Sequence, residues 1–344
     1  MAESVTIVGG GLAGLTLGIG LRQLGVPVTV WEAGRYPRHR VCGEFISGAG
    51  QGSLARLELL DGLQKAGAGA AGSAAFFAGK AMVAARPLRE AALCVSRFVL
   101  DAWLARQFQQ LGGELRSGAR WRGEFGTGLV RANGRRAEPV TGGWRWFGLK
   151  VHAREVALEA DLEMHFVPSG YVGLCQLPGG EVNICGLFRS EAAVPELAQR
   201  WRDWLGGPAS SALHARLADA RFDQDSFCSV AGLCLLPQRA TQRHECCLGD
   251  ALTMIPPVTG NGMSMAFESA ELATEPLAQF SRGDLSWAEA QQEIARRCDQ
   301  KFATRLRWAA WLQRALFQPA ARSVLMFLAA HSEWFWRGIF QRTR

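Results

Sequence analysis

The 344-residue sequence predicts an α/β protein that contains a parallel sheet, an inserted antiparallel sheet and a helical C-terminal segment. Three observations support this prediction. A glycine-rich turn joins two apolar runs near the N-terminus, β-type alternation begins at Trp144, and a tryptophan-rich helical pattern begins at about Trp287. With 48% hydrophobic and 20% charged residues the composition is that of a globular protein, and the length suffices for two domains.

Residues 5–34 (VTIVGGGLAGLTLGIGLRQLGVPVTVWEAG) have the pattern of a βαβ unit. Val5–Val8 and Val26–Trp31 are apolar runs suited to buried parallel strands, and Leu12–Leu24 has helical periodicity. Glu32 directly follows the second strand, where a carboxylate can accept hydrogen bonds from a ribose 2′-hydroxyl. The unit therefore predicts a Rossmann-like dinucleotide-binding domain.

The turn of this unit carries G-x-G-x-x-G at Gly9, Gly11 and Gly14. Gly9 permits the turn, Gly11 allows the backbone to approach a pyrophosphate, and Gly14 lets the helix pack against the strand. Because a helix N-terminus favours anions, we expect the backbone N–H groups of Leu12, Ala13 and Gly14 to face the phosphates.

A secretion signal is the alternative interpretation of the same apolar stretch, but the stretch lacks a basic start and glycines interrupt it. The nine cysteines show no paired C-x-x-C spacing. In a chain without an export signal they indicate reduced thiols. We therefore expect a cytoplasmic protein without a metal site.

The formal net charge of +7 comes from 38 basic and 31 acidic residues. The basic residues form no stripe interleaved with aromatic residues, and no zinc-finger spacing is present. We expect no nucleic-acid partner.

A second glycine-rich segment, GDALTMIPPVTGNGM, follows an apolar strand and opens another helix. An aspartate at the end of the strand can hold a ribityl hydroxyl, and helix N-terminal amides can face the pyrimidine edge of an isoalloxazine. Since reduced flavin carries negative charge at this edge, the segment indicates that the dinucleotide is FAD. The candidate residues are Asp250, Pro257, Gly260, Asn261, Gly262 and Met263.

The two motifs divide the chain into three predicted parts. A discontinuous FAD-binding domain comprises residues 1–69, 91–140 and 245–286, a substrate domain comprises 70–90 and 141–244, and a C-terminal helical segment comprises 287–344. Within the substrate domain, two strand-like runs flank PGGE, a strong signal for a β-hairpin.

Taken together, these motifs resemble the superfamily of FAD-dependent monooxygenases and geranylgeranyl reductases, which share the para-hydroxybenzoate hydroxylase fold, over about residues 4–285. The stretch SRFVLDAWLA is similar to the family's R-x-x-L-D-x-x-L helix, which implies that Arg97 lies beside the FAD phosphates. The stretch VCGEFIS is similar to the reductase branch and implies that Cys42–Ser47 runs along the cofactor; Arg40, just before it, is also assigned to cofactor binding.

The sequence departs from the hydroxylases in their middle motif, D-G-x-x-S, where NGRRA has Asn133 and Ala137 instead of the acid and the serine. This motif is associated with FAD and NAD(P)H handling. The electron donor is therefore left open, with NAD(P)H as a transient reductant that reaches the flavin through an open cleft.

Cys42 and Glu44 are the candidate catalytic residues, each able to donate a proton near the flavin; the alternative is a small filler for Cys42 and a loop hydrogen-bond partner for Glu44. The antiparallel sheet over residues 144–188 is expected to cover the flavin ring. Its candidate substrate residues are Met164, Phe166, Tyr171 and Leu174, which could also be simple core. His152 and His165 are expected to be satisfied polar residues of this sheet.

The C-terminal segment places Trp308, Trp311 and Leu312 on one helical face and most of its arginines elsewhere. This pattern fits a helix docked on the domain, and it also fits peripheral contact with a membrane surface. In both cases the apolar content indicates a lipophilic small-molecule substrate.

These observations predict an FAD-dependent oxidoreductase, foremost a monooxygenase that hydroxylates a lipophilic aromatic or quinol-type molecule. The alternatives are a geranylgeranyl-reductase-like flavoenzyme that saturates isoprenoid double bonds, which VCGEF favours, and a flavin-binding protein without turnover, which NGRRA favours.

Overall fold

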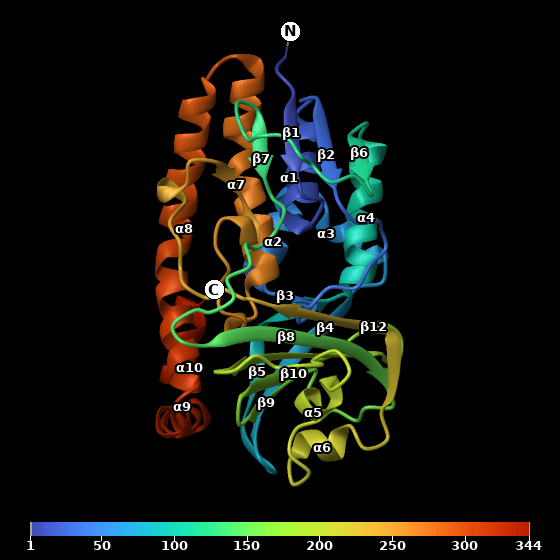
Figure 1. Cartoon of the computed structure of the whole chain (residues 1–344), viewed down its shortest axis with the longest axis vertical. Helices are drawn as coiled ribbons and strands as arrows, with labels where there is room; N and C mark the ends of the chain where they lie inside the picture. The colour runs from blue at the N-terminus through green and yellow to red at the C-terminus, as the bar shows by residue number, and fades with distance from the viewer. Residues whose placement is uncertain (1, 344) are drawn as a thin grey trace.

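The computed structural model describes residues 2–343, which form two sheets joined by helices (Figure 1). Sheet A has five parallel strands in the order β13-β7-β1-β2-β6. The strands are β1 (Val5–Val8), β2 (Val28–Glu32), β6 (Glu114–Ser117), β7 (Leu129–Arg131) and β13 (Cys246–Cys247). The predicted βαβ unit is confirmed, since β1 and β2 are adjacent and parallel.

The helix of this unit, α1 (Leu12–Gln23), packs between sheet A and two other helices, α4 (Arg97–Gln110) and α7 (Gly262–Arg282). Its residues from Leu12 to Leu21 are all buried. Two shorter helices, α2 (Gly48–Arg56) and α3 (Leu60–Lys65), complete this half of the molecule. Its core therefore combines segments that lie more than 200 residues apart in the sequence.

Sheet B has eight strands in the order β12-β8-β11-β10-β9-β4-β5-β3. All neighbours are antiparallel except β4 and β9, which are parallel. The strands are β3 (Phe45–Ile46), β4 (Gly69–Ala78), β5 (Ala81–Cys94), β8 (Arg145–Arg154), β9 (Leu162–Val167), β10 (Gly170–Gln176), β11 (Val182–Ser190) and β12 (Arg221–Ala231). The predicted PGGE hairpin joins β10 to β11, with Gly179 and Gly180 both at a φ of 75°.

Alternation along these strands gives sheet B two different faces. The outer face carries Leu149, Val151 and Val172, which pack under the short helices α5 (Trp201–Leu205) and α6 (Ala212–Arg216). The opposite face, called the inner face below, meets the loops of the sheet A half. Phe45 and Ile46, which fall within the predicted FAD-binding domain, form strand β3 of sheet B.

Three helices follow α7: α8 (Trp287–Leu316), α9 (Pro319–His331) and α10 (Glu333–Arg342). Helix α8 packs on α7 through a buried ion pair between Arg305 and Glu268, and α9 accepts hydrogen bonds from Arg86 of sheet B at the carbonyl of Ala329. Figure 1 shows these helices along one side of both halves. No helix within residues 2–343 is long and apolar enough to cross a membrane.

Candidate functional site

The first glycine turn lies between β1 and α1, and two of its glycines are required by close backbone approach. Gly9 has a φ of 117°, and a Cβ atom there would lie 2.3 Å from the carbonyl oxygen of Ala132 on the chain after β7. A Cβ at Gly14 would lie 1.9 Å from the carbonyl oxygen of Gly9. The packing role predicted for Gly14 is therefore seen in the structure.

Gly11 is different, because a Cβ atom there would meet nothing within 4 Å. Gly11 is also the N-cap residue of α1, and no side chain caps this helix. The N–H groups of Leu12 and Ala13 thus begin a helix whose N-terminus faces open space. That space and those uncapped N–H groups fit a pyrophosphate.

Glu32 lies at the end of β2, beside the glycine turn. Its carboxylate accepts hydrogen bonds from the N–H groups of Gly10 (2.9 Å) and Gly34 (2.7 Å), and it pairs with Arg38 at 2.8 Å. Burial acts to raise the pKa of Glu32, but the Gly34 N–H and the charge of Arg38 outweigh it and hold the pKa below its ordinary value. Both oxygens thus have protein partners, and a ribose hydroxyl would share them.

The second glycine segment lies against the segment 42–47, which the resemblance places along the cofactor. The Ser47 hydroxyl donates to Asn261 Oδ1 at 2.9 Å and lies 2.7 Å from the Ser264 hydroxyl, and the Phe45 ring lies against Gly260. The Asn261 amide donates to the carbonyl of Thr343, at the end of the C-terminal helices. A Cβ at Gly262 would meet nothing within 4 Å, so the N-terminus of α7 also faces open space.

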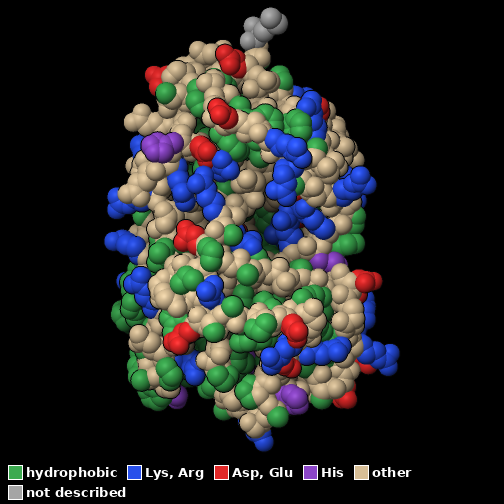
Figure 2. All heavy atoms as spheres, viewed as in Figure 1, with side chains coloured by type: hydrophobic (Ala, Val, Ile, Leu, Met, Phe, Trp, Pro, Cys, Tyr) green, Lys and Arg blue, Asp and Glu red, His purple; other side chains and the backbone are tan. Residues whose placement is uncertain are grey.

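Asp250 is the second residue of this segment and remains open to solvent, although surrounding protein atoms raise its pKa by burial. Arg97, Arg135 and Arg40 act on this pKa in the opposite direction. A carboxylate that is both solvent-accessible and surrounded by protein lies in a cleft. Figure 2 shows the molecule hollowed at mid-height, with Lys and Arg side chains gathered beside the hollow.

Arg97, at the start of α4, is held by a bidentate ion pair with Asp101 at 2.7 and 2.9 Å. Asp101 is fully buried and also lies 3.5 Å from Arg40. The arginines predicted to hold FAD phosphates are thus gathered at one carboxylate near Asp250. Fixed guanidinium groups at this place suit a doubly charged pyrophosphate.

Glu44, from the segment 42–47, is fully buried and has a positive φ of 60°. Its Oε1 accepts the Arg97 N–H at 2.9 Å and lies 3.6 Å from Lys150 Nζ, and its Oε2 lies 2.6 Å from His152 Nε2. Glu44 is therefore a loop residue at the centre of a buried polar cluster between the two halves.

Lys150 is the second buried charge of this cluster, with no exposed surface. Its ammonium lies 3.0 Å from His39 Nδ1, which must then accept the hydrogen bond. Burial, the charge of Lys150 and His152 together lower the pKa of His39 to about 4. His39 is therefore neutral at physiological pH.

Cys42 lies at the same place, and its thiol accepts a weak hydrogen bond from the Glu44 N–H at 3.5 Å. Its carbonyl accepts a hydrogen bond at 2.9 Å from Asn183 on the inner face of sheet B. Burial raises the pKa of the thiol, and the nearby Arg97 only partly opposes this. Cys42 is thus a neutral thiol near neutral pH, which favours a contact or proton-donor role over a nucleophilic one.

Three of the four predicted substrate residues share the inner face. Met164, Phe166 and Tyr171 form an apolar cluster with Leu187, the segment after Asp250 and the C-terminal helices. Leu174 was wrongly assigned, because it points to the outer face and is buried in the core with Val151 and Val172. It lies three residues after Tyr171 on one strand, so the two side chains face opposite ways.

The sequence analysis did not single out Lys150 or Glu181, and it predicted only a satisfied polar residue of the sheet at His152. The signal was present, because Lys150 and His152 are charged or polar residues two apart in the strand run WRWFGLKVHA, which is otherwise apolar from Trp146 onward. That spacing places both on one face of the sheet. The sequence could not predict that the segment 42–47 contacts Lys150 and His152.

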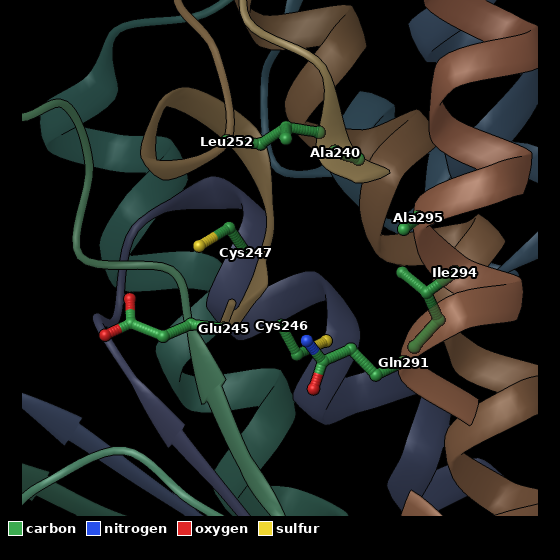
Figure 3. A pocket seen from close by; sticks show the side chains of 8 residues that line it. All are labelled: Ala240, Glu245, Cys246, Cys247, Leu252, Gln291, Ile294 and Ala295. Carbon is green, nitrogen blue, oxygen red and sulfur yellow. The ribbon is translucent and has the colours of Figure 1, made fainter. Parts of the chain in front are cut away.

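Two other places in the molecule do not suit a cofactor. The cavity in Figure 3, between Cys246, Cys247 and α8, encloses about 10 Å³, which is room for roughly one water molecule. A shallow surface groove beside α5, about 310 Å³, is lined by Val167, Phe188 and Trp204, far from the glycine turns in sequence and in sheet position. Within residues 2–343 no group of three or more His, Cys, Asp or Glu side chains is arranged so that it could hold a metal ion.

The comparisons with known proteins agree with this geometry at the level of the fold. Neither a scan of protein-family models nor a search of curated proteins finds a match. Solved structures match over nearly the whole chain. The p-nitrophenol 4-monooxygenase PnpA from Pseudomonas putida has a TM-score of 0.77 at 17% identity, with 99% of this chain and 97% of that chain covered.

A flavoprotein/dehydrogenase from Cytophaga hutchinsonii has a TM-score of 0.75 at 15% identity, covering 94% of this chain and 88% of that chain. The halogenase PltM has a TM-score of 0.72 at 16% identity, covering 99% and 86% respectively. The chain therefore has the fold shared by flavin-dependent monooxygenases, halogenases and dehydrogenases, as the two motifs predicted.

Proposed function

We propose that the protein is an FAD-dependent oxidoreductase, foremost a monooxygenase that hydroxylates a lipophilic aromatic or quinol-type molecule. The observation that carries this proposal is the pair of helix starts, α1 after Gly11 and α7 at Gly262, where a Cβ atom on either glycine would meet nothing within 4 Å. Each alone could hold an anion. Together with Asp250 in the cleft, they provide sites for the pyrophosphate and the isoalloxazine of one flavin dinucleotide.

In this proposal, the amides after Gly11 hold the pyrophosphate with Arg97 and Arg40 nearby, Asp250 holds the ribityl chain, and the start of α7 faces the isoalloxazine. FAD supplies the electron transfer and the oxygen chemistry when bound. The segment 42–47 and the inner face of sheet B exclude water from that chemistry and orient the substrate.

A lipophilic substrate is supported by the inner face itself. The apolar cluster of Met164, Phe166 and Tyr171 lies at one end. Across the sheet from Met164, the register places Gly173, then Cys185, then Lys150. A Cβ at Gly173 would have no neighbour closer than 3.6 Å, which leaves room above the middle of the sheet. A substrate with an apolar body and one polar group would place its body against the apolar cluster and its polar group toward Lys150 and His152.

The electron donor in this proposal is a nicotinamide that approaches through the cleft and leaves after hydride transfer. Only one G-x-G-x-x-G opens a helix in the sequence, and it is used by FAD in this proposal. The substituted middle motif, with Asn133 and Ala137, is the sequence feature that argues for a weak and transient encounter.

The three candidate functions differ in how the reduced protein reacts with oxygen. We expect purified protein to be yellow, and after anaerobic photoreduction to reoxidise in aerated buffer at a rate that rises severalfold when a lipophilic phenol is present. Stopped-flow absorbance measures this rate. Slow reoxidation in aerated buffer, together with reoxidation of the flavin by isoprenoid substrates in the absence of oxygen, would support the reductase. No change in either rate with any ligand would support a flavin-binding protein without turnover.

We further propose that the C-terminal helices contact an anionic membrane surface. Val324, Phe327 and Trp334 expose 59%, 61% and 81% of their surface on two successive helices. Residues 306–343 carry five arginines against one acidic residue, Glu333. Exposed aromatic side chains combined with basic charge favour interfaces of anionic lipid.

Phe327→Ser together with Trp334→Ser is expected to weaken binding to vesicles of phosphatidylglycerol and phosphatidylcholine by about tenfold or more, since both aromatic groups are lost from the interface. Co-sedimentation measures the bound fraction. Leu24→Ser is the control, because Leu24 is 49% exposed at the end of α1, outside the C-terminal helices. If wild-type protein fails to sediment with such vesicles at low salt, the membrane proposal is wrong.

A further inference from the structure

We propose that Glu44, His152 and Glu181 form a proton path from solvent to the segment 42–47. The inference rests on the proposed flavin chemistry at this segment and assigns a role to two residues outside the catalytic pair Cys42 and Glu44. His152 Nε2 lies 2.6 Å from Glu44 Oε2, and His152 Nδ1 lies 3.1 Å from Glu181 Oε2. One imidazole thus bridges two carboxylates.

The exposure of the three groups gives the path a direction. Glu44 has no exposed side-chain surface and His152 exposes 2% of its side chain, whereas Glu181 exposes 25%. Glu181 therefore meets solvent, and Glu44 meets the interior beside Cys42. The path runs from the N-terminal end of β11, which Glu181 precedes, to the place where the two halves of the molecule meet.

The two short contacts fix the number of protons. Each N···O hydrogen bond needs one proton between its atoms, so the three groups share two protons. These are arranged either as an imidazolium between two carboxylates or as a neutral ring with one protonated carboxyl group. Moving both protons along the chain transfers one proton equivalent from Glu181 to Glu44 without any side chain leaving its position.

The surrounding groups keep this path intact. On the same strand, Lys150 lies 3.6 Å from Glu44 Oε1, and His39 takes the other side of Lys150 as a neutral acceptor. The Arg97 N–H holds Glu44 Oε1. Opposite His152, the neighbouring strands β11 and β12 place Asn183 and Asp223. Glu44 Oε1 is thus held by the Arg97 N–H and the charge of Lys150, which orients the second oxygen toward His152.

A second histidine–glutamate contact, between His165 and Glu163 on the outer face of sheet B, does not continue into a path. His165 Nε2 lies 2.8 Å from Glu163 Oε2, a geometry close to that of His152 and Glu44. However, His165 Nδ1 has no partner among the described residues, and Glu163 is held by Arg216. This pair ends at the ring, and it is the natural control for the proposed path.

The proposed reactions need such a path, because both consume protons. Hydroxylation converts a C–H bond, O2, two electrons and two protons into C–OH and water, and saturation of a double bond adds two electrons and two protons. A nicotinamide hydride brings both electrons with one proton, so one further proton enters from solvent per turnover. Glu44 gives up that proton at the segment 42–47, and His152 and Glu181 replace it.

His152→Gln is expected to slow reoxidation of the photoreduced, FAD-bound protein in aerated buffer by about tenfold or more, and to enlarge its solvent deuterium isotope effect. This reaction takes up one proton as anionic reduced flavin and O2 give oxidised flavin and hydrogen peroxide. Stopped-flow absorbance with a pH-indicator dye follows the flavin and the proton together. His165→Gln should leave rate and isotope effect unchanged.

Glu181→Ala, at the partly exposed end, keeps the test decisive if His152→Gln does not fold; it should slow reoxidation in the same direction. A readout that does not depend on bound flavin is the downfield proton signal of the His152–Glu44 hydrogen bond in the apoprotein, which should vanish in His152→Gln and persist in His165→Gln. Unchanged rate and isotope effect in both path variants would overturn the proposal while FAD binding stands. Failure of wild-type protein to bind FAD would instead overturn the proposed function.

Discussion

Gly11→Val is expected to give a folded protein that no longer retains FAD, with an affinity at least 100-fold lower, or about 2.7 kcal/mol. Gly11 has a φ of −85°, which any residue adopts, and a Cβ atom there would touch no protein atom within 4 Å. The new side chain would instead fill the space in front of the N-terminus of α1, where the pyrophosphate is proposed to lie. Flavin absorbance after gel filtration measures retention.

Valine substitutions at two other glycines serve as comparisons for Gly11→Val. Gly126→Val is the matched control, because a Cβ at Gly126 also meets nothing within 4 Å and this glycine lies outside both motifs. Gly14→Val should fail to fold, since its Cβ would lie 1.9 Å from the Gly9 carbonyl oxygen. Full FAD retention in Gly11→Val would mean that the open space at α1 is not the phosphate site.

Glu268→Ala is expected to lower the free energy of unfolding by about 3–5 kcal/mol, because it leaves the Arg305 guanidinium buried without its partner. Arg305 and Glu268 expose 5% and 3% of their side chains and join α8 to α7 through two N–H···O bonds, one of 3.0 Å. Urea unfolding followed by tryptophan fluorescence measures the loss, since many of the tryptophans lie in the C-terminal helices.

Lys301→Ala is the control for this variant. Lys301 lies 3.7 Å from the same carboxylate but is 52% exposed, so its removal should cost no more than about 1 kcal/mol. Equal losses in the two variants would show that the C-terminal helices are held by their apolar contacts and not by the buried pair.

The parts of the fold and site that the sequence predicted are those with a local physical cause. The turn at Gly9 requires a positive φ, and Gly14 permits a close packing contact, so glycine spacing alone located the helix N-terminus of α1. The hairpin between β10 and β11 follows from two adjacent glycines with positive φ. Local chemistry of this kind can be read from a few neighbouring residues.

The remaining parts depend on contacts between distant segments. Alternation along β10 already shows that Tyr171 and Leu174 cannot share a face, but it does not say which of the two faces meets the sheet A half. Likewise, His152 gained its role only where the segment 42–47 brings Glu44 to it, 108 residues away in the sequence. Pairing between a loop and a strand at that distance leaves no local pattern.

The interleaved order of the two halves bears on how the protein is made. Strand β13 and helix α7, which complete sheet A and cover α1, are synthesised only after all strands of sheet B. A nascent chain thus carries its first glycine turn early, yet α1 lacks one of its two helical packing partners until Gly262 and the residues after it have left the ribosome. Nearly all of α1 is apolar and is buried in the folded protein, so its apolar surface stays exposed and prone to aggregation while residues 24–261 are synthesised. Chaperone supply and slow expression should therefore govern the yield of soluble protein more than the addition of FAD to finished chains.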